Sequence, residues 1–290
     1  MFKAIIEKKQ SQRSAAIQEL ASVKRGGGGA SFSERERVMK LLRLSLSQVV
    51  AQVQQGTISE EDVVAAYLMR ALDVAVDSNF LAEICQGPAP KRVASDHSLR
   101  GVTFSVADWI GMSSYDSTCG LASRALKPMT EDAVVVKVLR DHLQARPLFR
   151  TSVAQAAGSL DMGCFASETV NATWGRALNP HNKEFSTGGA CGGEAGLVAS
   201  NSIGIGLAVD VFGDARYPAA CCGVVAFKPT SKRMSQVGVS HASTRQAVCQ
   251  AVVTPIARSV KDISCLLKAL WDSKGQSLYD KAVCSLPFNH

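Results

Sequence analysis

The sequence predicts an α/β fold in which a sheet is covered by helices on both faces. Apolar runs of strand length alternate with segments of helical spacing along most of the chain. The composition is that of a globular protein, with 46% hydrophobic and 20% charged residues, which is enough for a sizeable core. No run approaches the roughly 18 consecutive apolar residues that a membrane-spanning helix needs. The length of 290 residues allows one large α/β domain or two small ones.

The N-terminal part predicts helices. Residues 1–22 have helical character, and the four glycines 26–29 predict a flexible joint behind them. A second helix is predicted from near Ser33 to about Gln54, where Gly56 stops it. Ser59 is typical of an N-cap because three acidic residues follow it, and this helix should run to about Val76. We therefore divide the chain into a basic arm with its glycine linker, residues 1–30, and an α/β domain, residues 31–290.

The rest of the chain predicts alternating elements. In order, we expect a strand over 102–110, a helix from 131, a strand from 147, a helix after the glycine-dense segment 188–196, strands over 203–209 and 222–227, and a helix over 259–271. The last residues predict a loop. This alternation is the pattern of an α/β sheet rather than of a helical bundle or a sandwich.

Basic charge is concentrated at the N-terminus. The formal net charge is +7, and residues 1–40 hold nine Lys or Arg against four Asp or Glu, so nine minus four places +5 there. A basic arm suits RNA, an anionic lipid surface, an acidic protein partner or organelle targeting, while a solvated helix face would account for it equally well. Transit peptides are poor in acids, so Glu7 and Glu19 weaken the targeting interpretation.

The cysteines and histidines predict neither disulfides nor a metal site. The nine cysteines form no C-x-x-C pair and lie on apolar segments, which is typical of reduced thiols in an intracellular compartment. They are Cys85, Cys119, Cys164, Cys191, Cys221, Cys222, Cys249, Cys265 and Cys284. The five histidines are scattered without ligand spacing. We expect no metal and no cofactor.

The segment from Ser186 to Glu194 is the most informative part of the sequence. Four glycines within six positions allow tight turns whose backbone N–H groups point inward. No Gly-Lys-Ser or Gly-Lys-Thr follows, which excludes a P-loop. Gly204 and Gly206 do not continue as a dinucleotide-binding motif, because Val209 stands where the third glycine belongs. Both nucleotide interpretations therefore fail.

Together with its surroundings, this segment resembles the amidase signature family, and most closely its fatty acid amide hydrolase branch. The resemblance covers about residues 41–271 in the right order. It rests on Gly188-Gly189-x-x-Gly192-Gly193, Asp210-x-x-Gly213-x-x-Arg216-x-Pro218, Cys222-Gly223-Val224-Val225-x-Phe227-Lys228-Pro229-Thr230, Pro255-Ile256-Ala257-Arg258-Ser259, Gly101-Val102-x-Phe104-Ser105-Val106 and Asp116-Ser117-Thr118. It implies a mixed, twisted sheet covered by helices on both faces.

The resemblance also implies a Ser-Ser-Lys triad, and this chain lacks it. Ala107 stands in the place of the catalytic lysine, Ala190 in that of the bridging serine, and Asp214 in that of the nucleophile. Loss of one triad member typically removes about 10⁴–10⁶ of the rate. What remains is a vestigial glycine loop and oxyanion segment made of Gly188, Gly189, Cys191, Gly192, Gly193, Val211, Phe212 and Gly213.

Two residues of this segment could carry a new role. Cys191 replaces the second serine of the loop and could be a thiolate nucleophile, but no histidine or lysine lies nearby in sequence, which favours a small structural residue. Asp214 could pair with Arg216 or a neighbouring lysine, which would turn the former active site into a charged structural joint. We expect the second arrangement rather than new chemistry.

The family's chains continue well beyond the segment that ends here at His290. We therefore expect a truncated amidase-like sheet whose open edge is covered by other protein subunits. The predicted function is that of a catalytically inactive accessory subunit of a large, mitochondrial complex. The alternative is a residual amidase or a lipid-binding protein that uses the old acyl pocket.

Overall fold

The computed structural model describes residues 2–25, 32–75, 77–85, 87, 90, 98–156, 166–240 and 250–289. The chain begins with four helices: α1 (Phe2–Arg25), α2 (Phe32–Leu42), α3 (Leu46–Gln54) and α4 (Glu60–Val74). The predicted N-terminal helix is confirmed, whereas the glycine linker lies outside the described residues.

Two capping serines define where α3 and α4 begin. The Ser45 hydroxyl accepts the N–H of Gln48, whose side chain accepts the N–H of Ser45, and this capping box starts a new helix. The prediction of one continuous helix from Ser33 to Gln54 is therefore wrong. Ser59 caps α4 in the same way with Asp62, which confirms the predicted N-cap. The predicted end of α4 at Val76 lies outside the described residues, and the helix ends at Val74.

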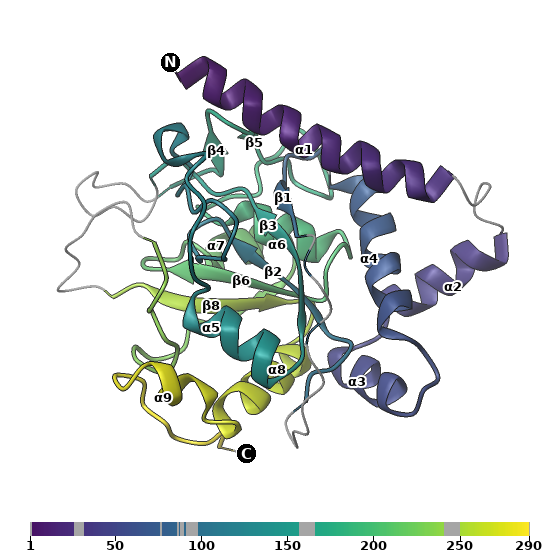
Figure 1. The fold of residues 1–290 in the computed structure, drawn as a ribbon, viewed down its shortest axis with the longest axis vertical. Helices are drawn as coiled ribbons and strands as arrows, with labels where there is room; N and C mark the ends of the chain where they lie inside the picture. The colour runs from purple at the N-terminus through teal and green to yellow at the C-terminus, as the bar shows by residue number, and fades with distance from the viewer. Residues whose placement is uncertain are drawn as a thin grey trace.

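A mixed six-stranded sheet forms the centre of the molecule (Figure 1). Its order is β1 (Leu81–Ile84), β3 (Arg146–Thr151), β2 (Thr103–Ala107), β6 (Ile205–Asp210), β8 (Val252–Ala257) and β7 (Val225–Ala226). Strand β2 runs parallel to β3 and β6, and the other pairs are antiparallel. Every residue of β2, β6 and β8 is buried, so both faces of the sheet are covered, as predicted.

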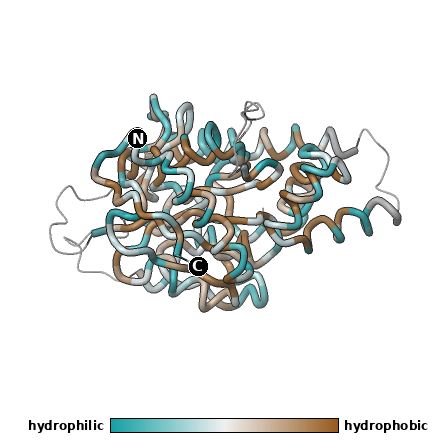
Figure 2. The backbone as a smooth tube through the Cα atoms, turned by 90° about the horizontal axis from the view of Figure 1, so that it is seen from below, coloured by the Kyte–Doolittle hydropathy of each residue, from teal (hydrophilic) through white to brown (hydrophobic). Residues whose placement is uncertain are grey.

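Helices and a small hairpin surround this sheet. Helix α6 (Gly192–Ala199) packs on β2, β6 and β8, and α8 (Val260–Asp272) packs on β8 and α3. The shorter elements are η1 (Ala122–Arg124), α5 (Val134–Lys137), η2 (Val138–His142), α7 (Arg216–Cys221), α9 (Gly275–Tyr279) and the hairpin of β4 (Val170–Asn171) with β5 (Gly175–Arg176). Figure 2 shows the hydrophobic stretches running through the middle of the molecule and the hydrophilic ones at its outer turns.

Several predicted boundaries differ from the structure for local reasons. Strand β2 ends at Ala107 because the N–H of Ile110 turns back to the carbonyl of Ala107. The helix predicted from Glu131 begins at Val134, since the N–H of Ala133 is bonded to Gly111. The strand predicted over 222–227 is reduced to β7, because α7 and its cap extend to Cys222. Strands β1 and β8 were not predicted, and the C-terminal loop contains α9.

Candidate functional site at the carboxyl ends of β2 and β6

Adjacent parallel strands place the first candidate residues at one end of the sheet. Val106 of β2 lies opposite Leu207 of β6, so the two strands end side by side at Ala107 and Asp210. Ala107 is fully buried and pairs with Thr151 of β3. The methyl side chain of alanine can neither accept nor donate a proton, so this position lacks a base for proton transfer.

The glycine segment joins this end of the sheet through two backbone hydrogen bonds. Gly188 and Gly189 have φ values of +73° and +56°, a left-handed conformation that favours glycine. The carbonyl of Ala190 accepts the N–H of Ala154, 2.9 Å away, just beyond the end of β3. The N–H of Cys191 donates to the carbonyl of Asp214 at 3.0 Å. The structure thus brings the Ala190 and Asp214 loops into direct contact.

The carboxylate of Asp214 lies in a cradle of backbone N–H groups. Its Oδ2 accepts the N–H of Val211 at 2.9 Å and that of Phe212 at 3.4 Å. Only 3% of Asp214 is exposed, and burial raises its pKa, an effect that these two hydrogen bonds oppose and that the charge of Asp210 reinforces. The segment that the family resemblance assigns to an oxyanion is therefore filled by the chain's own carboxylate.

Arg216 pairs with Asp210 and not with Asp214, which corrects the sequence-based expectation. Its Nε and Nη2 lie 3.0 Å from the two carboxylate oxygens of Asp210. Burial alone would raise the pKa of Asp210, but the bonds from Arg216 and from the N–H of Gly213 outweigh it, and the pKa lies below its ordinary value. Lys228 donates instead to the carbonyl of Val211, at 2.6 Å, which fixes the start of the same loop.

Cys191 is fully buried at the N-cap of α6. Its thiol donates to the carbonyl of Val209 at 3.5 Å. Burial, followed by the nearby charge of Asp214, raises the pKa of this thiol well above its ordinary value. A thiolate, the form needed for nucleophilic attack, is therefore disfavoured here.

Removing the Asp214 carboxylate should destabilise the protein. In Asp214→Ala the N–H groups of Val211 and Phe212 lose their acceptor inside the fold, at a cost of about 1–3 kcal/mol. Asp214→Asn keeps one carbonyl oxygen for them and serves as the matched control. Urea denaturation measures the difference in the free energy of unfolding between Asp214→Ala and Asp214→Asn. Equal values for the two variants would show that the cradle does not depend on this side chain.

A buried carboxyl that the sequence analysis missed lies beneath the glycine segment. Glu194 of α6 is fully buried and accepts hydrogen bonds from Ser105 of β2 at 2.5 Å and from Thr151 of β3 at 2.9 Å. Burial raises its pKa to about 8, against the partial opposition of the two hydroxyls and of Arg150. Glu194 lies in the first turn of a helix that begins with glycines, and nothing in this part of the sequence indicates that its side chain is buried.

This raised pKa predicts that stability falls with pH. The folded protein keeps the Glu194 proton where the unfolded carboxyl, near its ordinary 4.5, has released it. The free energy of unfolding should therefore fall by about 1.4 kcal/mol for each pH unit between these two pKa values. Glu194→Gln has no carboxyl to titrate at this position, so its free energy of unfolding should not fall in this way. The difference between the variant's and the parent's free energies of unfolding should therefore grow from pH 5 to 8 (about 3 pH units). Parallel urea titrations test this, and a constant difference would contradict it.

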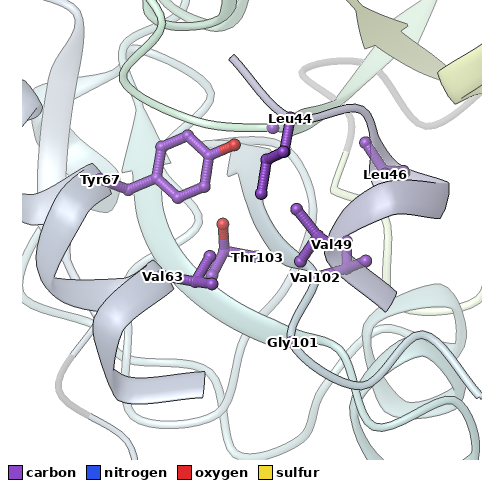
Figure 3. A pocket seen from close by; sticks show the side chains of 9 residues that line it. Leu44, Leu46, Val49, Val63, Tyr67, Gly101, Val102 and Thr103 are labelled. Atoms are coloured by element: carbon purple, nitrogen blue, oxygen red, sulfur yellow. The ribbon is translucent and has the colours of Figure 1, made fainter. Parts of the chain in front are cut away.

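A pocket lies at the opposite end of β2 from Ala107 (Figure 3). It is lined by apolar side chains of α3 and α4, and the hydroxyls of Tyr67 and Thr103 face it. Within the described residues, no cluster of His, Cys, Asp and Glu is arranged to hold a metal ion. None of the helices in the same residues is both long and apolar enough to cross a bilayer.

Comparisons with known proteins agree with this architecture. The amidase family model matches residues 62–288. Fatty-acid amide hydrolase 1 of Sus scrofa is 34% identical over 258 residues, which cover 86% of this chain and 42% of that protein. The vitamin D3 hydroxylase-associated protein of Gallus gallus is 29% identical, covering 86% of this chain and 53% of that protein.

The similarity extends to the three-dimensional fold. A solved structure of fatty acid amide hydrolase superposes with a TM-score of 0.82 at 21% identity, covering 99% of this chain and 54% of that one. The chain thus spans about half the length of the relatives it matches.

Proposed function

This chain belongs to the amidase family, and we propose that it is a catalytically inactive member that serves as a structural or accessory subunit of a larger protein complex. Acyl transfer needs a nucleophile, a base and positioned hydrogen-bond donors. The positions that match the family's lysine and bridging serine are the buried alanines Ala107 and Ala190. Neither side chain can move a proton.

The arrangement of Asp214 supports inactivity most strongly. A carboxylate in the nucleophile's place is a poor attacking group toward an amide, and it binds the N–H groups of Val211 and Phe212. These donors would have to be free for a developing oxyanion to be stabilised. A fixed negative charge at this point also repels the negative charge that forms in the transition state.

Three exposed aromatic side chains in and near the loop that carries Asp214 support binding to another protein. Phe212, Tyr217 and Phe227 are 52%, 41% and 46% exposed. Tyr217 belongs to α7, and Phe227 directly follows β7, an edge strand of the sheet. Apolar patches next to an open sheet edge favour protein–protein association. We propose that protein subunits cover this side, within a mitochondrial assembly. Lys9 and Arg13, two of the arm's basic residues, contact the chain's own body, so these two charges are not available to RNA or lipid.

The size of the native species tests this proposal. After gentle lysis, gradient fractionation with mass spectrometry should find the chain migrating with one large complex. Phe212→Ser combined with Phe227→Ser should shift it toward the free form, whereas the control Val260→Ser, at a 64% exposed position on α8, should not. A parent chain that migrates as a free monomer would overturn the accessory-subunit role and direct attention back to ligand binding.

A further inference from the structure

The hydroxyl of Thr103 is a buried polar group without a partner in the described part of the chain. Thr103 is the first residue of β2, and only 2% of it is exposed. Its Oγ1 has no hydrogen bond to any described residue. The hydroxyl of Ser105, two residues further along the same strand, donates to Glu194. Burying a hydroxyl costs free energy unless it is hydrogen-bonded, so the Thr103 hydroxyl requires a partner from outside the chain.

Thr103 shares the pocket at the start of β2 with a second hydroxyl (Figure 3). Tyr67 of α4 is 3% exposed, and its phenol faces the same space. Burial raises the pKa of this phenol, while the charge of Arg258 opposes the rise and that of Asp262 reinforces it. Tyr67 is therefore a neutral hydroxyl at ordinary pH, and such a group can both donate and accept a hydrogen bond.

The pocket is small, and its other side chains are apolar. Those of α3, α4 and the residue before β2 are each at most 4% exposed, and they are Leu46, Val49, Val63 and Val102. The room inside the pocket is about 10 Å³, which is what a single water molecule needs. A buried water also needs at least two polar partners, and the two hydroxyls supply them. An organic ligand would be too large for this space.

We propose that this pocket is a binding site for one ordered water molecule, which bridges the hydroxyls of Tyr67 and Thr103. Each hydroxyl can donate or accept, so one water satisfies both with one hydrogen bond to each. The bridge joins α4 to the first residue of β2 and thus attaches the N-terminal helices to the central sheet.

A double-mutant cycle in the full chain tests the bridge. Thr103→Val and Tyr67→Phe each remove one hydroxyl and keep the shape of the side chain. If one water serves both groups, either substitution removes the bridge. Each single variant should then lower the urea midpoint, and the double variant should lose clearly less than the sum of the two losses. Additive losses would overturn the proposal, and so would a raised midpoint in Thr103→Val, which is the result expected for a dry, unpaired hydroxyl.

Thr254→Val is the matched control for this cycle. Thr254 is a fully buried threonine of β8, and its hydroxyl donates to the carbonyl of Val252 at 3.0 Å. Because its partner belongs to the chain itself, the loss in this variant should add to that of Tyr67→Phe. Coupling of the same size in both cycles would show that the pocket water is not its source and would overturn the bridge.

A high-resolution crystal structure identifies the ligand directly. We expect one solvent peak within hydrogen-bond distance of both oxygens in the parent, and none at this place in Thr103→Val. The absence of a peak from the parent, or a peak bonded to only one hydroxyl, would overturn the bridge. Density larger than a single atom would overturn the choice of water as the ligand. These outcomes are independent of whether the chain is catalytically active or belongs to a larger complex.

Discussion

Replacement of Arg150 by methionine is expected to destabilise the protein by about 3–5 kcal/mol, because it leaves the buried carboxylate of Asp108 without its cation. Arg150 is fully buried in β3, and its guanidinium contacts Asp108 and Glu83. It also donates to the carbonyls of Ile110 and Asp116 at 2.7 and 2.6 Å. One side chain therefore fixes the loop that follows β2 as well as the β1 edge.

Thermal or urea unfolding measures this effect. The matched control is Arg37→Met, which removes an exposed pair with Asp62 at 2.9 Å and should cost less than about 1 kcal/mol. Burial, rather than the number of ion pairs, is what distinguishes the two sites. A loss at Arg150 no larger than that at Arg37 would mean that the buried network contributes little to the fold.

The second large effect is expected for Gly193→Ala in the first turn of α6. A β-carbon there would overlap the carbonyl oxygen of Ser152 and lie 2.9 Å from both the Ser152 nitrogen and the Phe80 carbonyl oxygen. All three atoms belong to the backbone, which cannot move aside without shifting β3 and its neighbours. We expect a loss of about 1–3 kcal/mol or more in the free energy of unfolding.

Gly204→Ala is the control for this substitution. The nearest atom to its added β-carbon is the hydroxyl oxygen of Tyr67 at 3.1 Å, which belongs to a side chain. Urea denaturation should therefore find a much smaller loss at Gly204 than at Gly193. Equal losses would contradict our interpretation that the glycine segment is required for close packing of α6 on the sheet, independently of any catalytic step.

Local signals in the sequence predicted much of the fold. Ser59 with its acidic neighbours located the start of α4, and the apolar run from Ile203 located β6, because both depend on residues adjacent in the chain. The break before α3 was not predicted, because Ser45 sits within a continuous helical pattern, although its capping box with Gln48 is a local signal. Strand β8 was missed as well, although all six of its residues are buried.

Contacts between distant residues could not be predicted in the same way. Lys9 and Asp116 are far apart in sequence, and nothing around Lys9 distinguishes it from the exposed lysines of the same helix. The partner of Asp214 was also predicted wrongly. A pairing of opposite charges suggested Arg216, but Asp210 takes that residue, and Asp214 turns toward backbone N–H groups that carry no side-chain signature.

The most direct test of our central claim is covalent labelling of the purified chain with a fluorophosphonate probe of serine hydrolases, with an active amidase as the positive control. We predict no labelled peptide, and amide hydrolysis at least about 10⁴-fold slower than that of the active enzyme. Labelling of a serine in this chain in proportion to the protein present, together with amide hydrolysis, would contradict the assignment of an inactive site and show that another residue has replaced the lost nucleophile.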